Sequence, residues 1–243
     1  MNRTIIVTGA SRGLGLYLSK RFVMRGDQVI GISQTKKYWK EARAFVRDSR
    51  RFKLVQLNLI SEKKVSHFFT QLKKEKIWID ILVNNAGYAG TLQRVEDISA
   101  EELNKNWQHN LVSQFLTIKY AFPFFKKQKK GFIVNISSMA GKRAVPRLFP
   151  YSASKFAVLA LSQCVAKENA ENGIKCITVC PSGMNTEMRA KLFGKKDASL
   201  QQSSDFVADI VMKVIHGKIE VLSGGDIVIC HGKIKAINPP PSA

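Results

Sequence analysis

Short apolar runs alternate with longer stretches of helical periodicity along the whole chain. The runs are rich in Val, Ile and Leu, and they occupy residues 4–9, 28–33, 52–59, 79–87, 131–138, 174–181 and 226–232. Between the first two runs, apolar residues recur at helical spacing, at Leu14, Leu18 and Phe22. Near-continuous apolar strands separated by helices are typical of a parallel sheet that is covered on both faces. The pattern therefore predicts a doubly wound α/β fold of about seven strands.

Polar residues mark where several of the helices are expected to begin. Ser61 is placed to cap the helix that follows the third strand, and Ser99 with Glu102 forms a capping-box pattern. That box opens a long helix, and further helices are expected at 13–26, 154–169 and 205–215. No linker or internal repeat divides the chain. We therefore expect one domain over residues 1–237, followed by a flexible tail over 238–243.

The chain carries a large excess of positive charge. Its 243 residues include 39 Lys and Arg against 18 Asp and Glu, which gives a formal net charge of +21. Such an excess fits a solvated basic surface, an anionic substrate or protein partner, or a nucleic acid. The basic residues are scattered, no cluster interleaves them with aromatic side chains, and no nucleic-acid-binding motif is present. Nucleic-acid binding is therefore the least favoured of the three.

Neither the cysteines nor the apolar runs indicate a metal centre or a membrane span. The four cysteines lack CxxC spacing, and Cys176 and Cys180 lie in an expected strand, so we expect free thiols and no metal. No run approaches the roughly 20 apolar residues that a membrane helix needs. The N-terminal segment lacks the apolar core and cleavage site of a secretory signal. We expect a cytoplasmic protein with no membrane partner.

A glycine-rich turn, TGASRGLG, joins the first expected strand to the first expected helix. Glycines at positions 9, 13 and 15 let the backbone approach a pyrophosphate closely, and the following helix start offers free N–H groups. The spacing differs from the GxGxxG dinucleotide fingerprint. Its position between strand and helix nevertheless favours a dinucleotide cofactor over a plain tight turn.

The end of the second strand indicates which dinucleotide is bound. Sites that prefer NAD usually place an acidic residue there, where it binds the 2′-hydroxyl of the ribose. Here the strand ends in GISQTKK, with Ser33 and Gln34 and no acid. Arg12 in the glycine turn and Lys36 and Lys37 after the strand would attract a 2′-phosphate. We therefore expect NADP(H) to be preferred over NAD(H).

Five motifs occur in an order and spacing that resemble the short-chain dehydrogenase/reductase family. They are TGASRGLG (8–15), NNAG (84–87), NISS (135–138), YSASK (151–155) and PSGMNT (181–186). The resemblance covers nearly the whole chain, and within the family it is most similar to the 3-oxoacyl-[acyl-carrier-protein] reductase group. It implies a single-domain Rossmann-like fold and an NAD(P)-dependent oxidoreductase that transfers a hydride between nicotinamide and a ketone or secondary alcohol.

The resemblance also implies roles for individual residues. Tyr151 would be the catalytic acid and base with Lys155 as its partner, Ser138 would bind the carbonyl oxygen, and Asn110 would complete the catalytic set. The residues implied at the cofactor are Thr8, Gly9, Ser11, Arg12, Gly13, Leu14, Gly15, Ser33, Asn58, Leu59, Asn85, Ala86, Gly87, Tyr151, Lys155, Pro181, Met184 and Thr186.

The catalytic set is chemically reasonable without the resemblance. Ketone reduction needs a proton donor at the forming alkoxide, and a free phenol has a pKa of about 10. Lys155 lies four residues after Tyr151 and so shares its helical face, from which its ammonium would lower the pKa of the phenol. A hydroxyl such as that of Ser138 can orient the carbonyl and share its developing charge.

Two features near the expected substrate site differ from the family or remain open. Ser182 stands where family members usually have glycine, and we expect it to restrict that loop. The polar segment between Thr186 and Phe206 would form a substrate lid. Its three lysines, Lys191, Lys195 and Lys196, would suit an anionic or polar substrate.

Three classes of function therefore stay open. The favoured one is NADP(H)-dependent reduction of a small-molecule carbonyl. Its leading substrate is a 3-oxoacyl thioester on an acidic acyl carrier protein, as in fatty acid biosynthesis, ahead of a sugar or other polar ketone. A catalytically silent NADP(H)-binding scaffold is the second class, which the complete catalytic set disfavours, and a nucleic-acid binder is the third. Apolar faces on the two long helices that carry Asn110 and Lys155 favour a homodimer or homotetramer.

Overall fold

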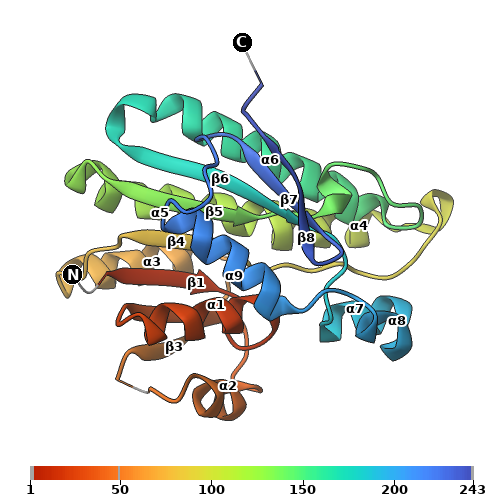
Figure 1. Ribbon diagram of the computed structural model, residues 1–243, viewed down its shortest axis with the longest axis horizontal. Helices are drawn as coiled ribbons and strands as arrows, with labels where there is room; N and C mark the ends of the chain where they lie inside the picture. The colour runs from red at the N-terminus through yellow and green to blue at the C-terminus, as the bar shows by residue number, and fades with distance from the viewer. Residues whose placement is uncertain (1–2, 49, 242–243) are drawn as a thin grey trace.

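The computed structural model, which describes residues 3–48 and 50–241, is built around one eight-stranded sheet (Figure 1). Its spatial order is β3-β2-β1-β4-β5-β6-β7-β8, and every neighbouring pair is parallel except β7 and β8. The strands are β1 (Thr4–Thr8), β2 (Gln28–Ser33), β3 (Phe52–Gln56), β4 (Ile81–Asn84), β5 (Gly131–Ile136), β6 (Ile174–Pro181), β7 (Asp226–Cys230) and β8 (Lys233–Asn238).

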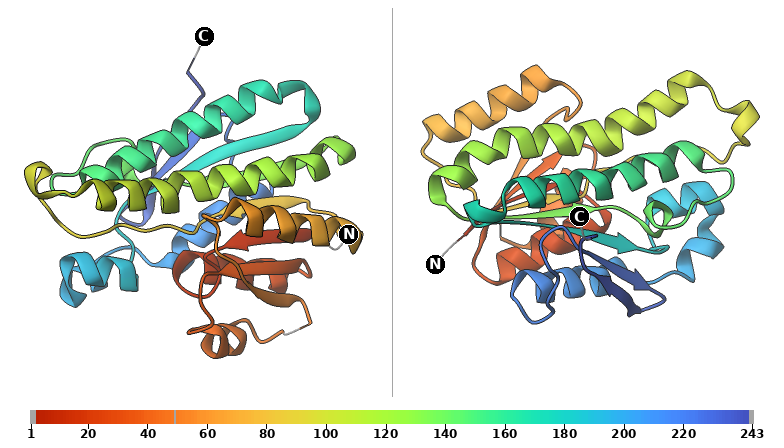
Figure 2. Two further views of the ribbon diagram at one scale, coloured as in Figure 1. Left: turned by 180° about the vertical axis from the view of Figure 1, so that it is seen from behind. Right: turned by 90° about the horizontal axis from the view of Figure 1, so that it is seen from above.

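Helices cover both faces of the sheet, and each face has its own apolar core (Figures 1 and 2). One core joins the sheet to α1 (Gly13–Met24), α2 (Trp39–Val46) and α9 (Ser204–Ile215). The other joins it to α3 (Glu62–Lys74), α5 (Ser113–Gln128) and α6 (Phe149–Glu168). The remaining helices are α4 (Ala100–Trp107), α7 (Glu187–Phe193) and α8 (Lys195–Ser199), with the short turns η1 (Val95–Asp97), η2 (Gln108–Val112), η3 (Met139–Gly141) and η4 (Ala170–Asn172).

The strand order reverses between β1 and β4, and this reversal opens a crevice. The chain moves from β1 outward to β3 on one side, and from β4 outward to β8 on the other. The connections that leave β1 and β4 therefore diverge at the carboxyl ends of these strands. Ligands of doubly wound sheets bind at this switch point.

A chain of buried hydrogen bonds runs from α5 through β4 and β5 to α6, on the face of the sheet that both helices cover. The Thr117 hydroxyl donates to Asn84 Oδ1 at 2.7 Å, and Asn84 Nδ2 donates to Asn135 Oδ1 at 2.9 Å. Asn135 Nδ2 then donates to the Ser162 hydroxyl at 2.9 Å. All four residues are fully buried, and Asn84 and Asn135 are register partners in β4 and β5. The chain fixes both long helices to the centre of the sheet.

The expected doubly wound fold is confirmed, with eight strands where about seven were expected. The additional strand is β8, an antiparallel edge strand that the apolar runs did not reveal. It ends at Asn238, the first residue of the expected tail, while residues 242–243 lie outside the described part of the chain. The third strand ends at Gln56 instead of residue 59, and α6 begins at Phe149, five residues earlier than expected.

The two expected helix caps differ in outcome. Ser99 caps α4, because its hydroxyl accepts from the Glu102 N–H at 3.1 Å. The Glu102 carboxylate accepts from Tyr88 and Asn106 instead of completing the box. Ser61 occupies the N-cap position of α3, but its side chain makes no capping hydrogen bond. Among the described residues, no helix has the length and apolar composition for a bilayer span.

Replacing Asn135 with Ala is expected to lower the free energy of unfolding by about 2–4 kcal/mol, because it leaves the buried Asn84 amide unpaired and opens a small cavity. Urea unfolding followed by circular dichroism measures the change. Asn104→Ala, at an exposed position of α4, is the matched control and should stay within about 0.5 kcal/mol of the wild type. An equally small effect of Asn135→Ala would contradict a supporting role for the chain.

Candidate active site

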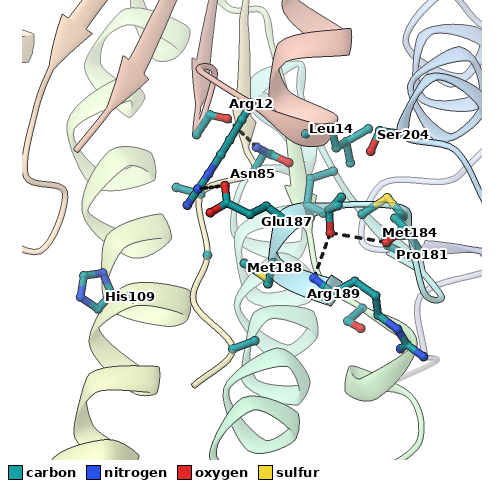
Figure 3. Close-up of a pocket in the computed structure, with 18 of the residues that line it drawn as sticks. Arg12, Leu14, Asn85, His109, Pro181, Met184, Glu187, Met188, Arg189 and Ser204 are labelled. Atoms are coloured by element: carbon teal, nitrogen blue, oxygen red, sulfur yellow. Dashed lines mark hydrogen bonds and ion pairs between the residues drawn. The ribbon is translucent and has the colours of Figure 1, made fainter. Parts of the chain in front are cut away.

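A cavity of about 790 Å³ lies at the carboxyl ends of the strands, between the loops that leave β1, β2, β3, β4, β5 and β6. Helix α7 contributes Glu187, Met188 and Arg189 to its lining (Figure 3). Nearly all of the cofactor and catalytic residues expected from the sequence line this cavity. The three that do not line it are Thr8, Gly15 and Asn110.

The glycine turn packs so tightly that side chains cannot be added. Gly9 has a φ of +67°, and a Cβ there would lie 2.8 Å from Asn85 Nδ2. A Cβ on Gly15 would lie 2.4 Å from the Gly9 carbonyl oxygen. Gly15 therefore supports the turn from behind, which explains why it does not reach the cavity. The first turn of α1 has no side-chain cap at Arg12, so its N–H groups remain available to a phosphate group.

Thr8 joins this turn to the loop after β4. Its hydroxyl accepts hydrogen bonds from the N–H groups of Asn85 and Ala86, both at 2.9 Å. Asn85 Nδ2 returns a hydrogen bond to the Thr8 carbonyl at 2.9 Å. These contacts hold two walls of the cavity at a fixed separation. The glycine cradle and its free amides fit the pyrophosphate of a dinucleotide.

At the end of β2, the Ser33 hydroxyl is already engaged. It donates to the Thr35 carbonyl at 2.9 Å and accepts from Trp39 Nε1 at 2.7 Å. Ser33 lines the cavity as expected, but its hydroxyl is committed within the protein. Lys36 and Lys37 lie against the rings of Trp39 and Tyr38, at 5.6 and 5.1 Å from the ring centroids. Two positively charged side chains therefore lie close to this end of the cavity.

An ion pair between α7 and the glycine turn closes the mouth of the cavity. The Arg12 guanidinium contacts the Glu187 carboxylate and lies 4.9 Å from the centroid of the Tyr38 ring (Figure 3). Glu187 also accepts from the Tyr38 hydroxyl at 3.0 Å and pairs with Lys191 at 3.0 Å. Hydrogen bonding to Lys191, Tyr38 and Arg12 lowers the pKa of Glu187 to about 2. Tyr38 and Glu187 were not expected at this site from the sequence.

Tyr151, Lys155 and Ser138 meet on one side of the cavity. Tyr151 and Lys155 are one turn apart on α6, and Lys155 Nζ lies 5.7 Å from the Tyr151 ring centroid. Lys155 is buried and donates to the Ile136 carbonyl at 3.0 Å. Ser138 follows β5, and its oxygen accepts from the Ala140 N–H at 3.1 Å. Because that oxygen accepts, the hydroxyl proton is free to point elsewhere.

The protonation of this group differs from the sequence-based expectation. Burial raises the pKa of the Tyr151 phenol above its usual value, and hydrogen bonding with Ser138 offsets only part of this. Lys155 was expected to lower it. Burial instead lowers the pKa of Lys155 itself to about 8, since the ammonium loses its hydration. The phenol is therefore held in its protonated form near neutral pH.

Asn110 lies behind the cavity wall and is fully buried. Its side chain accepts from the Tyr88 N–H at 2.8 Å, and it donates to the Tyr88 carbonyl at 2.7 Å and to Ser154 at 2.9 Å. It sits in η2, a π-helical turn between α4 and α5. A Cβ on Gly87 would lie 3.1 Å from Asn110 Oδ1 and 3.5 Å from Lys155 Nζ. Asn110 is thus close to Lys155 across Gly87, with its side chain committed to the protein.

Beyond Tyr151 the cavity is mostly apolar. It is lined there by His109, Met139, Arg143, Val145, Leu148, Met188, Leu192 and Phe193. Burial and the nearby Lys105 lower the pKa of His109, so its ring is neutral at neutral pH. The lid lysines do not line the cavity: Lys191 pairs with Glu187, and Lys195 and Lys196 are exposed on α8.

Ser182 fits its loop without backbone strain, although we expected it to restrict a loop in which family members usually have glycine. It lacks a positive φ, and its N–H donates to the Ile229 carbonyl at 2.8 Å. A Cβ on the next residue, Gly183, would approach Gln201 Oε1, the end of a flexible side chain that is able to shift. Within residues 3–48 and 50–241, no group of three His, Cys, Asp or Glu side chains could hold a metal ion.

Comparison with known proteins agrees with this geometry. Residues 3–197 match the family described as short chain dehydrogenase. The chain is 32% identical to an NADPH-dependent pterin aldehyde reductase of Arabidopsis thaliana, over 84% of this chain and 83% of that protein. It is also 32% identical to the 3-oxoacyl-[acyl-carrier-protein] reductase FabG of Haemophilus influenzae, over 80% and 79%. The crystal structure of levodione reductase shares the fold, with a TM-score of 0.87 at 21% identity over 95% and 96% of the two chains.

Proposed function

We propose that the chain, which belongs to the short chain dehydrogenase family and is an oxidoreductase acting on alcohol or carbonyl groups, reduces a ketone with NADPH. The observation that carries the proposal is the meeting of Tyr151, Lys155 and Ser138 in a cavity whose other end fits a dinucleotide. A carbonyl placed between these two ends would have a proton donor within reach.

Tyr151 acts as the general acid in this proposal. Its raised pKa keeps the phenol protonated at neutral pH, which is the form needed to protonate a developing alkoxide. The Ser138 hydroxyl donates a hydrogen bond to the carbonyl oxygen and stabilises the negative charge that develops there. The Lys155 ammonium stabilises the phenolate that remains after proton transfer. Asn110 positions the Tyr88 loop and Ser154 around these groups.

The glycine turn, Asn85, Ala86 and Gly87 are the residues that would hold the dinucleotide, with Pro181, Met184 and Thr186 at the nicotinamide end. When bound, the cofactor supplies the hydride. Asn58 and Leu59 line the adenosine end in this assignment. Because the residues proposed for cofactor binding and catalysis line one cavity, we propose a single catalytic domain over residues 1–237.

A preference for NADP(H) is supported by the charges around β2. Arg12 lines this end of the cavity, Lys36 and Lys37 follow the strand and lie over Trp39 and Tyr38, and the strand ends without an acid. The NADPH-dependent relative of Arabidopsis thaliana points the same way. Among the described residues, Glu187 is the one acidic residue lining the cavity, and it pairs with Arg12. A 2′-phosphate would have to share Arg12 with this carboxylate or displace it.

A 3-oxoacyl thioester on an acyl carrier protein remains a candidate substrate, supported by similarity to FabG of Haemophilus influenzae and by the basic surface. A polar ketone is the second candidate substrate. We further propose a cytoplasmic location, because the cysteines are free thiols among the described residues. We also propose a homodimer or homotetramer. The helices α4, α5 and α6 lie side by side (Figure 2). They expose the large apolar side chains of Leu103, Trp107, Phe115, Phe149 and Phe156, which support association.

Tyr151→Phe is expected to abolish carbonyl reduction while cofactor binding is retained, because it removes one hydroxyl and leaves the ring in place. The decrease should be at least about 10²-fold, the magnitude of a lost general acid. NADPH absorbance with acetoacetyl thioesters, polar ketones and sugars measures turnover, and cofactor fluorescence measures binding. A wild-type protein that binds NADPH but reduces none of these carbonyls would favour the scaffold alternative.

The rate of reduction is expected to fall above about pH 8, where Lys155 loses its proton. The lowered pKa of Lys155 means that its ammonium is present below about pH 8 and absent above it. The kcat/KM for NADPH, which reports groups of the free enzyme, should decrease about tenfold per pH unit beyond that point. A profile that stays flat to pH 9.5 would show that the Lys155 charge is not required.

NADPH is expected to bind more tightly than NADH, by about tenfold or more, because Arg12 can form charge-assisted hydrogen bonds with the 2′-phosphate. Calorimetric titration with both nucleotides measures the difference. Arg12→Ala should reduce the affinity for NADPH and leave that for NADH nearly unchanged. Glu187→Gln should raise the affinity for NADPH, since it removes the competing charge. Tighter binding of NADH to the wild type would overturn the preference.

A further inference from the structure

Four cationic side chains line the cavity, and three of them are occupied by groups of the protein itself. Arg12 pairs with Glu187, and Lys155 donates to the Ile136 carbonyl. Arg189 pairs with Asp197 through both ends of its guanidinium, at 2.5 and 3.0 Å, and points away from the Arg12 contact (Figure 3). The fourth, Arg143, has no side-chain hydrogen bond or ion pair to any residue in 3–48 or 50–241.

The position of Arg143 is set by the same segment that positions the proposed catalytic groups. Its N–H donates to the Met139 carbonyl at 2.9 Å, which closes the turn that begins at Ser138. Two residues later, the Val145 N–H donates to the Ser152 hydroxyl at 3.2 Å, beside Tyr151. Arg143 therefore lies in the β5–α6 connection, whose two ends carry Ser138 and Tyr151.

The surroundings of Arg143 in the cavity do not neutralise its charge. Val145 and Leu148, which follow Arg143 in the same connection, and Met188 of α7 contribute apolar lining to the cavity. His109 is neutral, and the one acidic residue of the lining, Glu187, is engaged by three donors at the cofactor end. An anion brought into this part of the cavity would therefore find a guanidinium with no intramolecular competitor.

We infer that the substrate carries an oxyanion, a carboxylate or a phosphate, which Arg143 binds while the carbonyl lies at Tyr151 and Ser138. The inference rests on the carbonyl reduction proposed above and names the substrate class for the same site. Arginine suits this role, because its planar fork can bind two oxygens of either group at once. The anionic group binds and takes no part in the reaction.

The lid lysines cannot supply this recognition. Lys191, Lys195 and Lys196 were expected from the sequence to suit an anionic or polar substrate, but none of them lines the cavity. Lys142, next to Arg143 in sequence, is also occupied, because it pairs with the buried Asp226 at 2.8 Å. Specificity for an anion therefore depends on Arg143 alone among the described side chains of the substrate end.

Matched substrate pairs test the inference. Pyruvate, acetoacetate and levulinate are each compared with their methyl esters, and dihydroxyacetone phosphate is compared with dihydroxyacetone. The first three pairs vary the distance from carbonyl to charge, and the last distinguishes phosphate from carboxylate. In at least one pair, kcat/KM should be about 10- to 100-fold higher for the anion, the magnitude of a charge-assisted hydrogen bond. Higher salt should reduce this ratio.

Three variants then locate the effect. Arg143→Met should bring the ratio to within about twofold of one while leaving the neutral substrates unchanged, and Arg143→Lys should keep part of it. Arg147→Met, at an exposed arginine outside the cavity, is the matched control and should keep the wild-type ratio. Thermal unfolding and NADPH binding of each variant should match the wild type, since Arg143 is exposed and contacts no carboxylate.

The outcomes separate this inference from the function on which it rests. If neutral ketones are reduced and no anion is favoured, the inference is wrong and carbonyl reduction stands. The same holds if Arg143→Met affects anions and neutral substrates equally. If no carbonyl is reduced although NADPH binds, both the function and the inference are overturned.

Discussion

The buried hydrogen-bond chain from Thr117 through Asn84 and Asn135 to Ser162 is the constraint on which the site depends. Each buried amide would be costly without a partner, so the four groups can be buried together only in one arrangement of α5 and α6 on the sheet. Apolar packing alone would tolerate small shifts of these helices. The polar chain removes that freedom, which sets the depth of α6 and hence of Tyr151 and Lys155.

A second set of contacts fixes the opposite wall. Thr8 binds the backbone of Asn85 and Ala86, and the missing side chains of Gly9 and Gly15 allow the turn to lie directly against Asn85. The cofactor end and the catalytic end are therefore both tied to β4, at the point where the strand order reverses. The separation between Tyr151 and the glycine turn is thus set by the sheet.

Much of the fold and site could be predicted from sequence because the signals are local. The apolar runs located seven strands, and the motifs placed nearly all of the expected residues in one cavity. Strand β8 escaped because its burial alternates, although the turn at His231 and Gly232, both with positive φ, has the geometry of a two-residue hairpin. Tyr38 and Glu187 escaped because their contact joins segments 149 residues apart. The raised pKa of Tyr151 could not be predicted because its largest cause, burial, depends on the whole fold.

The net charge of +21 acquires meaning only when the partners of individual side chains are known. Many lysines and arginines lie over aromatic rings at the surface, as Lys20 does over Phe45 at 4.1 Å, where the charge remains solvated. Inside the cavity, by contrast, the protein uses nearly every charge on itself, so that net charge predicts little about what binds there. Recognition of a substrate is decided by the charged side chain that has no internal partner. Such a side chain can bind an oppositely charged ligand without first breaking an ion pair or hydrogen bond within the protein. This is why one unpaired arginine between Ser138 and Tyr151 carries more information about the substrate than the whole basic surface.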